Sequence, residues 1–184
     1  MKTWEPGQIS FGGFPRSGNH SLGFILTNAF SDRNVIWLRH RITDLSTAPN
    51  CAVVIRNPLE SVSSWIECNY DERPDAVDRI LDWYVRYMNG VLDCQERLAI
   101  FKLEDVSKNP YGCSIAFSTK FDLEKPKEVK APQVEEWLTQ NMPTHFISDI
   151  SISKERWYNA VQSNQLYEKA VSLYNKAYLI TELI

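Results

Sequence analysis

The segment GGFPRSGNHSL, residues 12–22, has the residue types of a turn that binds an anion. Gly13 and Gly18 are spaced as in the phosphate loop G-x-x-x-x-G-K-[ST], in which backbone N–H groups hold phosphate oxygens. Asn19 and His20 stand where that pattern has its lysine and its magnesium-binding hydroxyl. The glycines could serve only to turn the chain. If the loop does bind an anion, the substitutions argue against a magnesium triphosphate.

Two arginines favour an anion site. Arg16 lies inside the glycine turn, and its planar guanidinium group matches the oxygens of phosphate or sulfate. Arg56 belongs to the segment VVIRNPLESVSSW, residues 53–65, where it ends an apolar run of strand length. Pro58 can begin the following helix, and Ser64 would lie two turns into it. Taken alone, Arg56 could be a strand-end ion pair and Ser64 a neutral helix residue, but parallel α/β sheets bind ligands at the ends of such strands.

Segments typical of strands and helices alternate along the chain. QISFGGF, NVIWLRH, CAVVIRN and RLAIFKL are short apolar runs of strand length. Apolar residues recur at helical spacing after the glycine turn, from Val77 to Leu92 and from Leu166 to Ala177. Residues 124–143, rich in Lys, Glu and Pro, are expected to form a surface excursion. The alternation predicts one α/β domain over residues 1–184, a parallel β-sheet flanked by helices.

Composition limits the classes of function. The chain has 184 residues, 43% of them hydrophobic, and a net charge of −3, which argues against a nucleic-acid partner. Its four cysteines include no C-x-x-C pair, and no apolar leader precedes the first strand, so we expect a reducing, cytoplasmic environment. Its apolar runs are shorter than the roughly 20 residues that span a bilayer, so no transmembrane segment is expected.

Both anion-binding segments resemble those of the sulfotransferases. FPRSGNHSL is similar to the 5′-phosphosulfate loop of that family, Y-P-K-S-G-T-T-W-L. IRNPLESVSS resembles the family's 3′-phosphate segment, R-N-P-x-[DE]-x-x-x-S, in the same order along the chain. Weaker likenesses follow around Glu104-Asp105 and in the C-terminal helical region. The resemblance implies a compact P-loop-NTPase-like sulfotransferase fold, with 3′-phosphoadenosine 5′-phosphosulfate as co-substrate, 3′,5′-adenosine bisphosphate as product and no metal requirement.

The resemblance also implies a role for each site residue. Arg16 would take the place of the family's catalytic loop lysine and neutralise charge on the bridging oxygen as the sulfuryl group leaves. His40, which ends the segment NVIWLRH, would be the general base that accepts the acceptor's proton. The 3′-phosphate would contact Arg56 and Ser64, and more weakly assigned cations, Lys154 and Arg156. The 5′-phosphosulfate would lie on Ser17, Gly18, Asn19, His20 and Ser21.

Some positions depart from the family pattern. Ser21 replaces the tryptophan that stacks on adenine, and Leu103 replaces the tyrosine of Y-E-D-L. Adenine recognition is therefore not defined by the sequence. Neither is the acceptor, which could be a carbohydrate, a lipid, a phenol or another small molecule, or a peptide, nor is the oligomeric state. A magnesium-dependent P-loop kinase and a non-catalytic nucleotide-binding module remain the alternatives.

Overall fold

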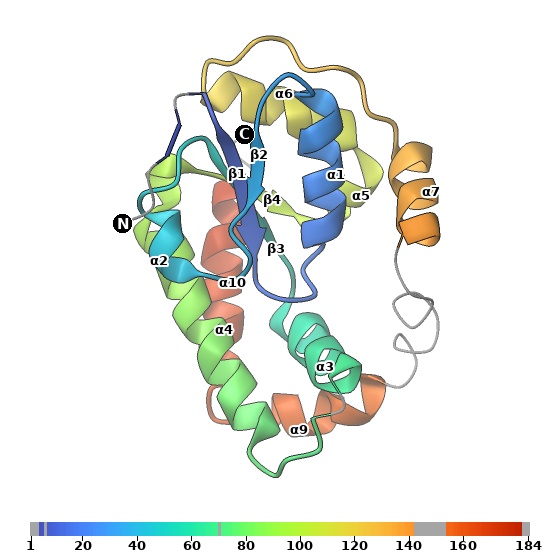
Figure 1. Ribbon diagram of the computed structural model, residues 1–184. Helices are drawn as coiled ribbons and strands as arrows, with labels where there is room; N and C mark the ends of the chain where they lie inside the picture. Colours follow the sequence, from blue (N-terminus) through green and yellow to red (C-terminus); the bar gives the residue numbers. More distant parts are fainter. Residues whose placement is uncertain (1–3, 6, 70, 142–153, 182–184) are drawn as a thin grey trace.

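Four parallel strands form the centre of the molecule (Figure 1). The computed structural model describes residues 4–5, 7–69, 71–141 and 154–181. The strands are β1 (Ile9–Gly13), β2 (Val35–Trp37), β3 (Cys51–Ile55) and β4 (Leu98–Lys102). Their order is β2-β1-β3-β4, with Phe11 paired with Trp37 on one side of β1 and with Ala52 on the other. All four lie in runs that the sequence predicts to be strands, and the parallel sheet is confirmed.

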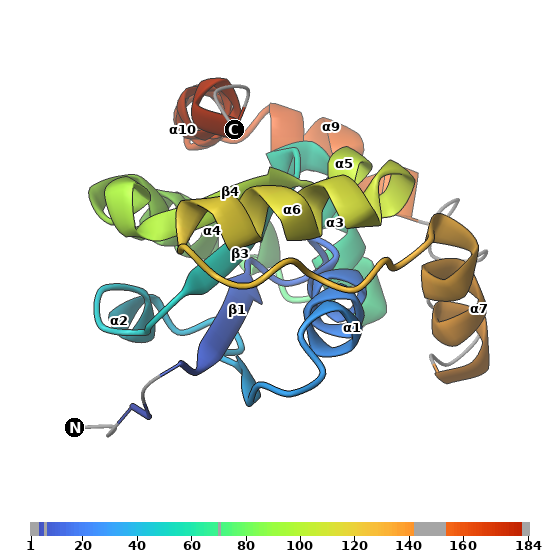
Figure 2. The ribbon, with the colours of Figure 1, turned by 90° about the horizontal axis from the view of Figure 1, so that it is seen from above.

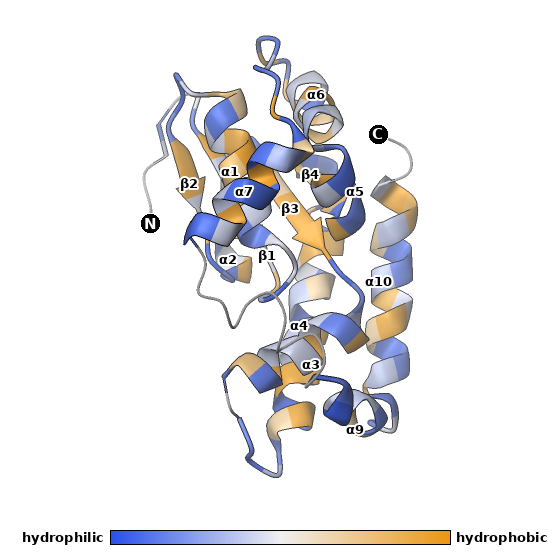
Figure 3. Cartoon of the chain, turned by 90° about the vertical axis from the view of Figure 1, so that its right-hand side faces the viewer, coloured by the Kyte–Doolittle hydropathy of each residue, from blue (hydrophilic) through white to orange (hydrophobic). Residues whose placement is uncertain are grey.

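Each face of the sheet is covered by helices because the inner strands are apolar on both sides. In β3, Val53 and Ile55 pack into one core, whereas Ala52 and Val54 pack into the other. This division follows from the alternation of side chains along a strand. Figure 3 shows the strongly hydrophobic colouring of β3 between the helices. Such a run, buried on both faces, is typical of a parallel sheet.

The first face carries the helix that follows the glycine turn. This helix, α1 (Asn19–Ala29), lies beside α5 (Leu103–Lys108), α6 (Pro110–Lys120) and α7 (Ala131–Asn141). The strap of residues 123–130 leads from α6 to α7 (Figure 2). It is held to the first core by Val129, which is buried, and by a hydrogen bond from Lys127 N–H to Ala29 O, 2.9 Å. The expected surface excursion is therefore packed against the domain and ends in a helix.

The opposite face is covered mainly by two long helices, α4 (Ala76–Asp93) and α10 (Tyr167–Thr181). Shorter elements complete this side: α2 (Ile42–Leu45), η1 (Gln95–Arg97), η3 (Lys154–Trp157) and α9 (Tyr158–Gln162). The helix α3 (Pro58–Cys68) begins at the carboxyl end of β3 and lies beyond the strand ends (Figure 1). No helix among the described residues is long and apolar enough to cross a membrane.

The strand order places a crevice between β1 and β3. The chain passes from β1 through α1 to β2 on one side, and then returns through α2 to β3 on the other side of β1. At such a reversal the loops after the two central strands diverge, and open α/β sheets bind ligands there. Arg16 follows β1 and Arg56 follows β3, so both predicted anion-binding segments meet at this crevice.

Candidate active site

The glycine turn connects β1 to α1 through a backbone that only certain residues tolerate. Gly18 has φ 91° and Arg16 has φ 65°, both in the left-handed region. A Cβ at Gly13 would lie 2.4 Å from Asn19 Oδ1 and 2.7 Å from Val54 O, so only glycine fits there. At Gly18 the left-handed φ already disfavours other residues.

The turn presents the amino end of α1 to the crevice. Because α1 begins at Asn19, helix geometry leaves the N–H groups of Asn19, His20 and Ser21 without acceptors inside the helix. Such N–H groups and the helix dipole favour an anion. The Ser17 N–H is instead donated to Phe14 O, 3.2 Å away, and its side chain is fully buried. Ser17 therefore shapes the turn, whereas the next residues offer the donors.

Asn19 fixes the turn from inside. Its Nδ2 donates to Phe14 O at 3.0 Å and more weakly to Gly13 O at 3.4 Å. Two buried oxygens of the turn, Asn19 Oδ1 and Ser17 Oγ, make no hydrogen bond to the part of the chain that the structure describes. Asn19 thus stands where the phosphate loop has its lysine, but its side chain is buried and stabilises the turn by hydrogen bonding.

The two arginines are linked to each other and to α3. Arg16 Nε donates to Ser64 Oγ at 3.0 Å, and Ser64 is buried, with only 2% of its surface exposed. Arg56 Nη1 donates to the carbonyl oxygen of Arg16 at 2.9 Å, and Arg56 Nη2 donates to Glu60 Oε2 at 2.9 Å. Burial lowers the pKa of Arg16, and the charge of Arg56 lowers it further. Two guanidinium groups therefore concentrate positive charge at the strand ends, as an anion site requires.

Glu60 joins this cluster to the C-terminal segment. Lys154 Nζ donates to Glu60 Oε2, and the Tyr158 hydroxyl donates to Glu60 Oε1. Burial raises the pKa of Glu60, but the hydrogen bonds from Lys154 and Tyr158 and the charges of Lys154 and Arg56 outweigh burial and lower it. Lys154 and Arg56 therefore share the carboxylate of Glu60.

Arg156, in η3, contacts the end of α3 instead. Its Nε donates to Glu67 Oε2 at 2.8 Å, and that oxygen also accepts from Trp157 Nε1 at 3.0 Å. Of the two cations predicted near the C-terminus, the structure thus brings Lys154 to the arginine cluster and pairs Arg156 with Glu67 instead.

His40 lies just beyond β2 and is held against the glycine turn. Its Nδ1 is 2.8 Å from Gly13 O. Because a carbonyl oxygen only accepts, Nδ1 carries the proton, and the lone pair of neutral His40 is on Nε2. Burial lowers the pKa of His40; the hydrogen bond to Gly13 raises it, and the charge of Arg39 lowers it. The net effect is a neutral imidazole at pH 7, the form that can accept a proton.

Aromatic rings surround His40. The Trp37 and Trp83 rings each have their centroids 5.9 Å from the imidazole and meet it edge-on. Trp65 contacts Trp83, and His20 contacts Trp37 at 5.4 Å. Burial lowers the pKa of His20, and the charge of Arg16 lowers it further.

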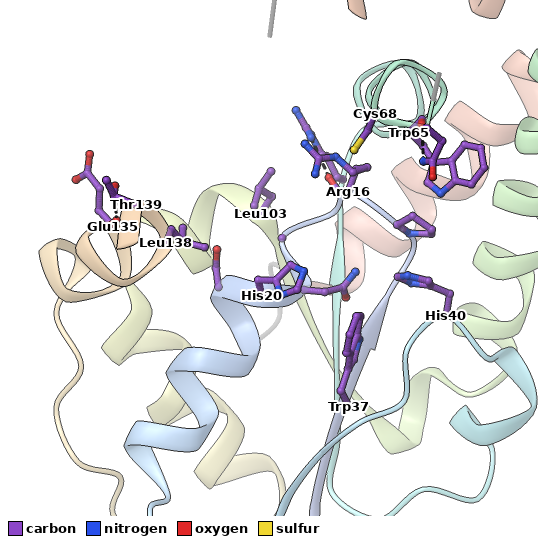
Figure 4. A pocket seen from close by; sticks show the side chains of 16 residues that line it. Arg16, His20, Trp37, His40, Trp65, Cys68, Leu103, Glu135, Leu138 and Thr139 are labelled. Atoms are coloured by element: carbon purple, nitrogen blue, oxygen red, sulfur yellow. Dashed lines mark hydrogen bonds between the residues drawn. The ribbon is translucent and has the colours of Figure 1, made fainter. Parts of the chain in front are cut away.

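Several of these residues line one cavity of about 480 Å³ (Figure 4). Arg16, His40 and Arg56 reach it from the strand ends and His20 from the first turn of α1. The rest of this wall includes Trp37, Trp65 and Cys68. Figure 4 shows Leu103 beside the glycine turn, with α7 across the opening. Three residues on one face of α7 complete the lining, namely Glu135, Leu138 and Thr139. No group of three or more His, Cys, Asp or Glu side chains able to hold a metal ion occurs among the described residues.

Comparison with known proteins gives no assignment. No protein-family model matches the chain, and neither the curated proteins nor the solved structures contain a match.

Some residues in and around the cavity were not predicted from the sequence. Glu60 was detectable, because it is the acidic residue of R-N-P-x-[DE], although its partners were not. Trp37 lies three residues before His40 in an apolar run. This position is only a weak indication that the ring lies at the end of the strand, beside the histidine. The face of α7 gave no signal, because its place in the cavity depends on the packing of the strap.

Proposed function

We propose that the chain is a compact sulfotransferase with a P-loop-NTPase-like sulfotransferase fold. It would transfer a sulfuryl group from 3′-phosphoadenosine 5′-phosphosulfate to a hydroxyl or amine group of an acceptor. The observation that carries the proposal is the meeting of three groups at one cavity. Arg16 in the glycine turn, Arg56 at the next strand end and neutral His40 all line it.

The site suits sulfuryl transfer better than magnesium-dependent phosphoryl transfer. A transferring sulfuryl group carries less negative charge than a phosphoryl group, so backbone N–H groups and cations can supply the electrostatic stabilisation. The turn offers the N–H groups of α1 together with Arg16. Asn19 is committed to the turn through its hydrogen bond to Phe14 O, and so does not replace a phosphate-binding lysine.

Each residue has a role in the proposed reaction. The N–H groups of residues 19–21 hold the 5′-phosphosulfate, and Arg16 offsets charge on its bridging oxygen. His40 Nε2 accepts the proton of the acceptor hydroxyl as the acceptor oxygen bonds to sulfur. The bond from sulfur to the 5′-phosphate oxygen breaks at the same time, and 3′,5′-adenosine bisphosphate leaves.

The remaining donor contacts follow from the cavity walls. Arg56 lines the cavity where the 3′-phosphate would bind, whereas Ser64 of α3 is not among the lining residues and accepts a hydrogen bond from Arg16 Nε. Lys154 is linked to Arg56 through the carboxylate of Glu60. On the opposite side, Leu103 and Leu138 supply apolar contacts that could take over from the missing aromatic stack on adenine.

A thermal-shift comparison tests the proposal. We expect 3′,5′-adenosine bisphosphate to stabilise the protein without metal, by about 2.7 kcal/mol at a hundredfold excess over its dissociation constant. ATP should stabilise it poorly, with or without magnesium. Strong magnesium-dependent stabilisation by ATP would indicate a kinase instead, and bisphosphate binding without turnover of any acceptor would indicate a non-catalytic module.

A further inference from the structure

A second cavity runs along the outer side of α1. Its volume is about 540 Å³, and it lies between α1, the edge strand β2 and α7. Phe24 of α1 and Trp137 of α7 form one wall, with their ring centroids 5.1 Å apart. Val35 and Trp37 of β2 form the other. We call this cavity the α1–β2 groove.

The floor of the groove depends on a helical glycine. A Cβ at Gly23 would lie 2.5 Å from Cζ of Phe11 and 2.9 Å from its Cε2. The absence of a side chain at Gly23 therefore lets the Phe11 ring of β1 lie directly against α1. The ring and the helix backbone together line the bottom of the groove.

The groove adjoins the candidate active site. Asn19, His20 and Trp37 line both cavities. Trp37 is 40% exposed and stands between the rings of His20 and His40. A molecule that lies in the groove would therefore have one end at Trp37, next to the imidazole proposed to accept the proton.

The size and polarity of the groove limit what it can hold. From His20 to Asn28 it follows α1 for about 12 Å, at 1.5 Å per residue. His20 is the sole titratable group among the described residues that line it, and the other end has the neutral residues Thr27 and Asn28. The walls thus suit an uncharged, elongated apolar body and do not offer the charges that would recognise an anionic sugar chain or a basic peptide.

We propose that the α1–β2 groove binds the apolar body of the sulfuryl acceptor, and that the acceptor is an amphipathic alcohol or phenol. Its hydroxyl lies at His40 Nε2, and its alkyl or ring body passes Trp37 toward Thr27. This assignment rests on the proposed function for the reaction, but binding in the groove is measurable without turnover.

The test uses the 4-n-alkylphenols from phenol to 4-heptylphenol as probes. Their dissociation constants are measured by calorimetry with 3′,5′-adenosine bisphosphate present and absent. Each methylene that enters the groove should tighten binding by up to about fourfold, as expected for a buried CH₂ group. With the sulfate donor, mass spectrometry should show that 4-heptylphenol is sulfated at a lower concentration than phenol.

A blocking variant locates the body of the probe. Thr27→Trp fills the far end of the groove from an exposed helix position, so the fold should be kept. We expect it to remove most of the gain of 4-heptylphenol over phenol, while phenol and the bisphosphate bind as before. Thr119→Trp, at an exposed position on α6, is the matched control and should keep the gain. Asn28→Trp provides a second block if Thr27→Trp does not fold.

The outcomes separate this inference from the proposed function. Affinity that does not rise with chain length, or rises equally in Thr27→Trp and Thr119→Trp, would overturn the groove assignment even if the bisphosphate binds. If the bisphosphate fails to bind while the block still removes the chain-length gain, the sulfotransferase proposal fails and the groove stands as an apolar ligand site.

Discussion

His40 Nδ1 lies 2.8 Å from the carbonyl oxygen of Gly13, so the imidazole after β2 is fixed to the turn after β1. This contact joins two segments that lie 27 residues apart in the sequence. The strand that ends in the glycine turn thereby also sets the tautomer of the histidine, and leaves the lone pair of neutral His40 on Nε2. Any shift of the turn would therefore move the imidazole as well.

Replacing His40 with alanine tests its role as base. We expect His40→Ala to lower turnover by about 100-fold or more, because loss of a general base typically has an effect of this size. The dissociation constant of 3′,5′-adenosine bisphosphate, measured by calorimetry, should change little. His20→Ala is the comparison, with a much smaller loss of turnover expected. If turnover were unchanged in His40→Ala and lost in His20→Ala, the base would be His20.

The pH dependence of turnover should follow the imidazole of His40. Burial lowers the pKa of His40 below its ordinary value of 6.5, so the neutral form that the proposed reaction requires predominates at pH 7. Turnover should therefore be constant above about pH 7 and fall as the pH drops through a value below 6.5. A steady-state profile from pH 5 to 9 measures this. A midpoint above 7 would be incompatible with His40 as a buried neutral base.

The sequence predicted the parts of the site that depend on local pattern. Strands β1 and β3 were recognisable from their apolar runs, and the parallel order that these imply brings Arg16 and Arg56 to the same edge. The glycine turn was recognisable from the spacing of Gly13 and Gly18. The structure gives the reason for that spacing, because both positions disfavour a side chain.

Contacts between distant elements could not be predicted in this way. The rings around His40 come from β2, α3 and α4, and helical spacing alone does not show that Trp65 and Trp83 converge there. The partner of Arg156 depends on how the C-terminal segment packs against α3. The site therefore combines two local motifs with a wall that only the tertiary fold creates.

The two C-terminal cations should differ in their effect on the donor. Lys154 shares the carboxylate of Glu60 with Arg56, whereas Arg156 is paired with Glu67. We expect Lys154→Ala to weaken binding of the bisphosphate by about 3- to 10-fold, because Lys154 is close to Arg56 but does not line the cavity. Arg156→Ala should change it less than about twofold, because Arg156 is paired with Glu67 and does not line the cavity. Titration calorimetry measures both, and a larger loss for Arg156→Ala would reverse the assignment.

The last prediction concerns the 3′-phosphate, which distinguishes the proposed donor from any ligand with a 5′-phosphate alone. If Arg56 binds it through charge-assisted hydrogen bonds, each contributes about 1.5–3 kcal/mol at most. Arg56→Ala should then weaken 3′,5′-adenosine bisphosphate by roughly 10- to 100-fold. Adenosine 5′-phosphosulfate, which has no 3′-phosphate, should lose only about twofold, because Arg56 also holds the carbonyl oxygen of Arg16.

Two further variants complete this test. Ser64→Ala should act in the same direction as Arg56→Ala but more weakly, since it removes a neutral partner, and it also frees the Nε donor of Arg16. Arg86→Ala, which removes an exposed arginine paired with Asp82 on α4, is the control for loss of one positive charge and should leave both ligands unaffected. Equal losses for the two ligands in Arg56→Ala, in a protein that remains folded, would mean that Arg56 supports the glycine turn and does not bind the 3′-phosphate. The measurement is therefore the ratio of the two dissociation constants, which a general weakening of the site leaves unchanged.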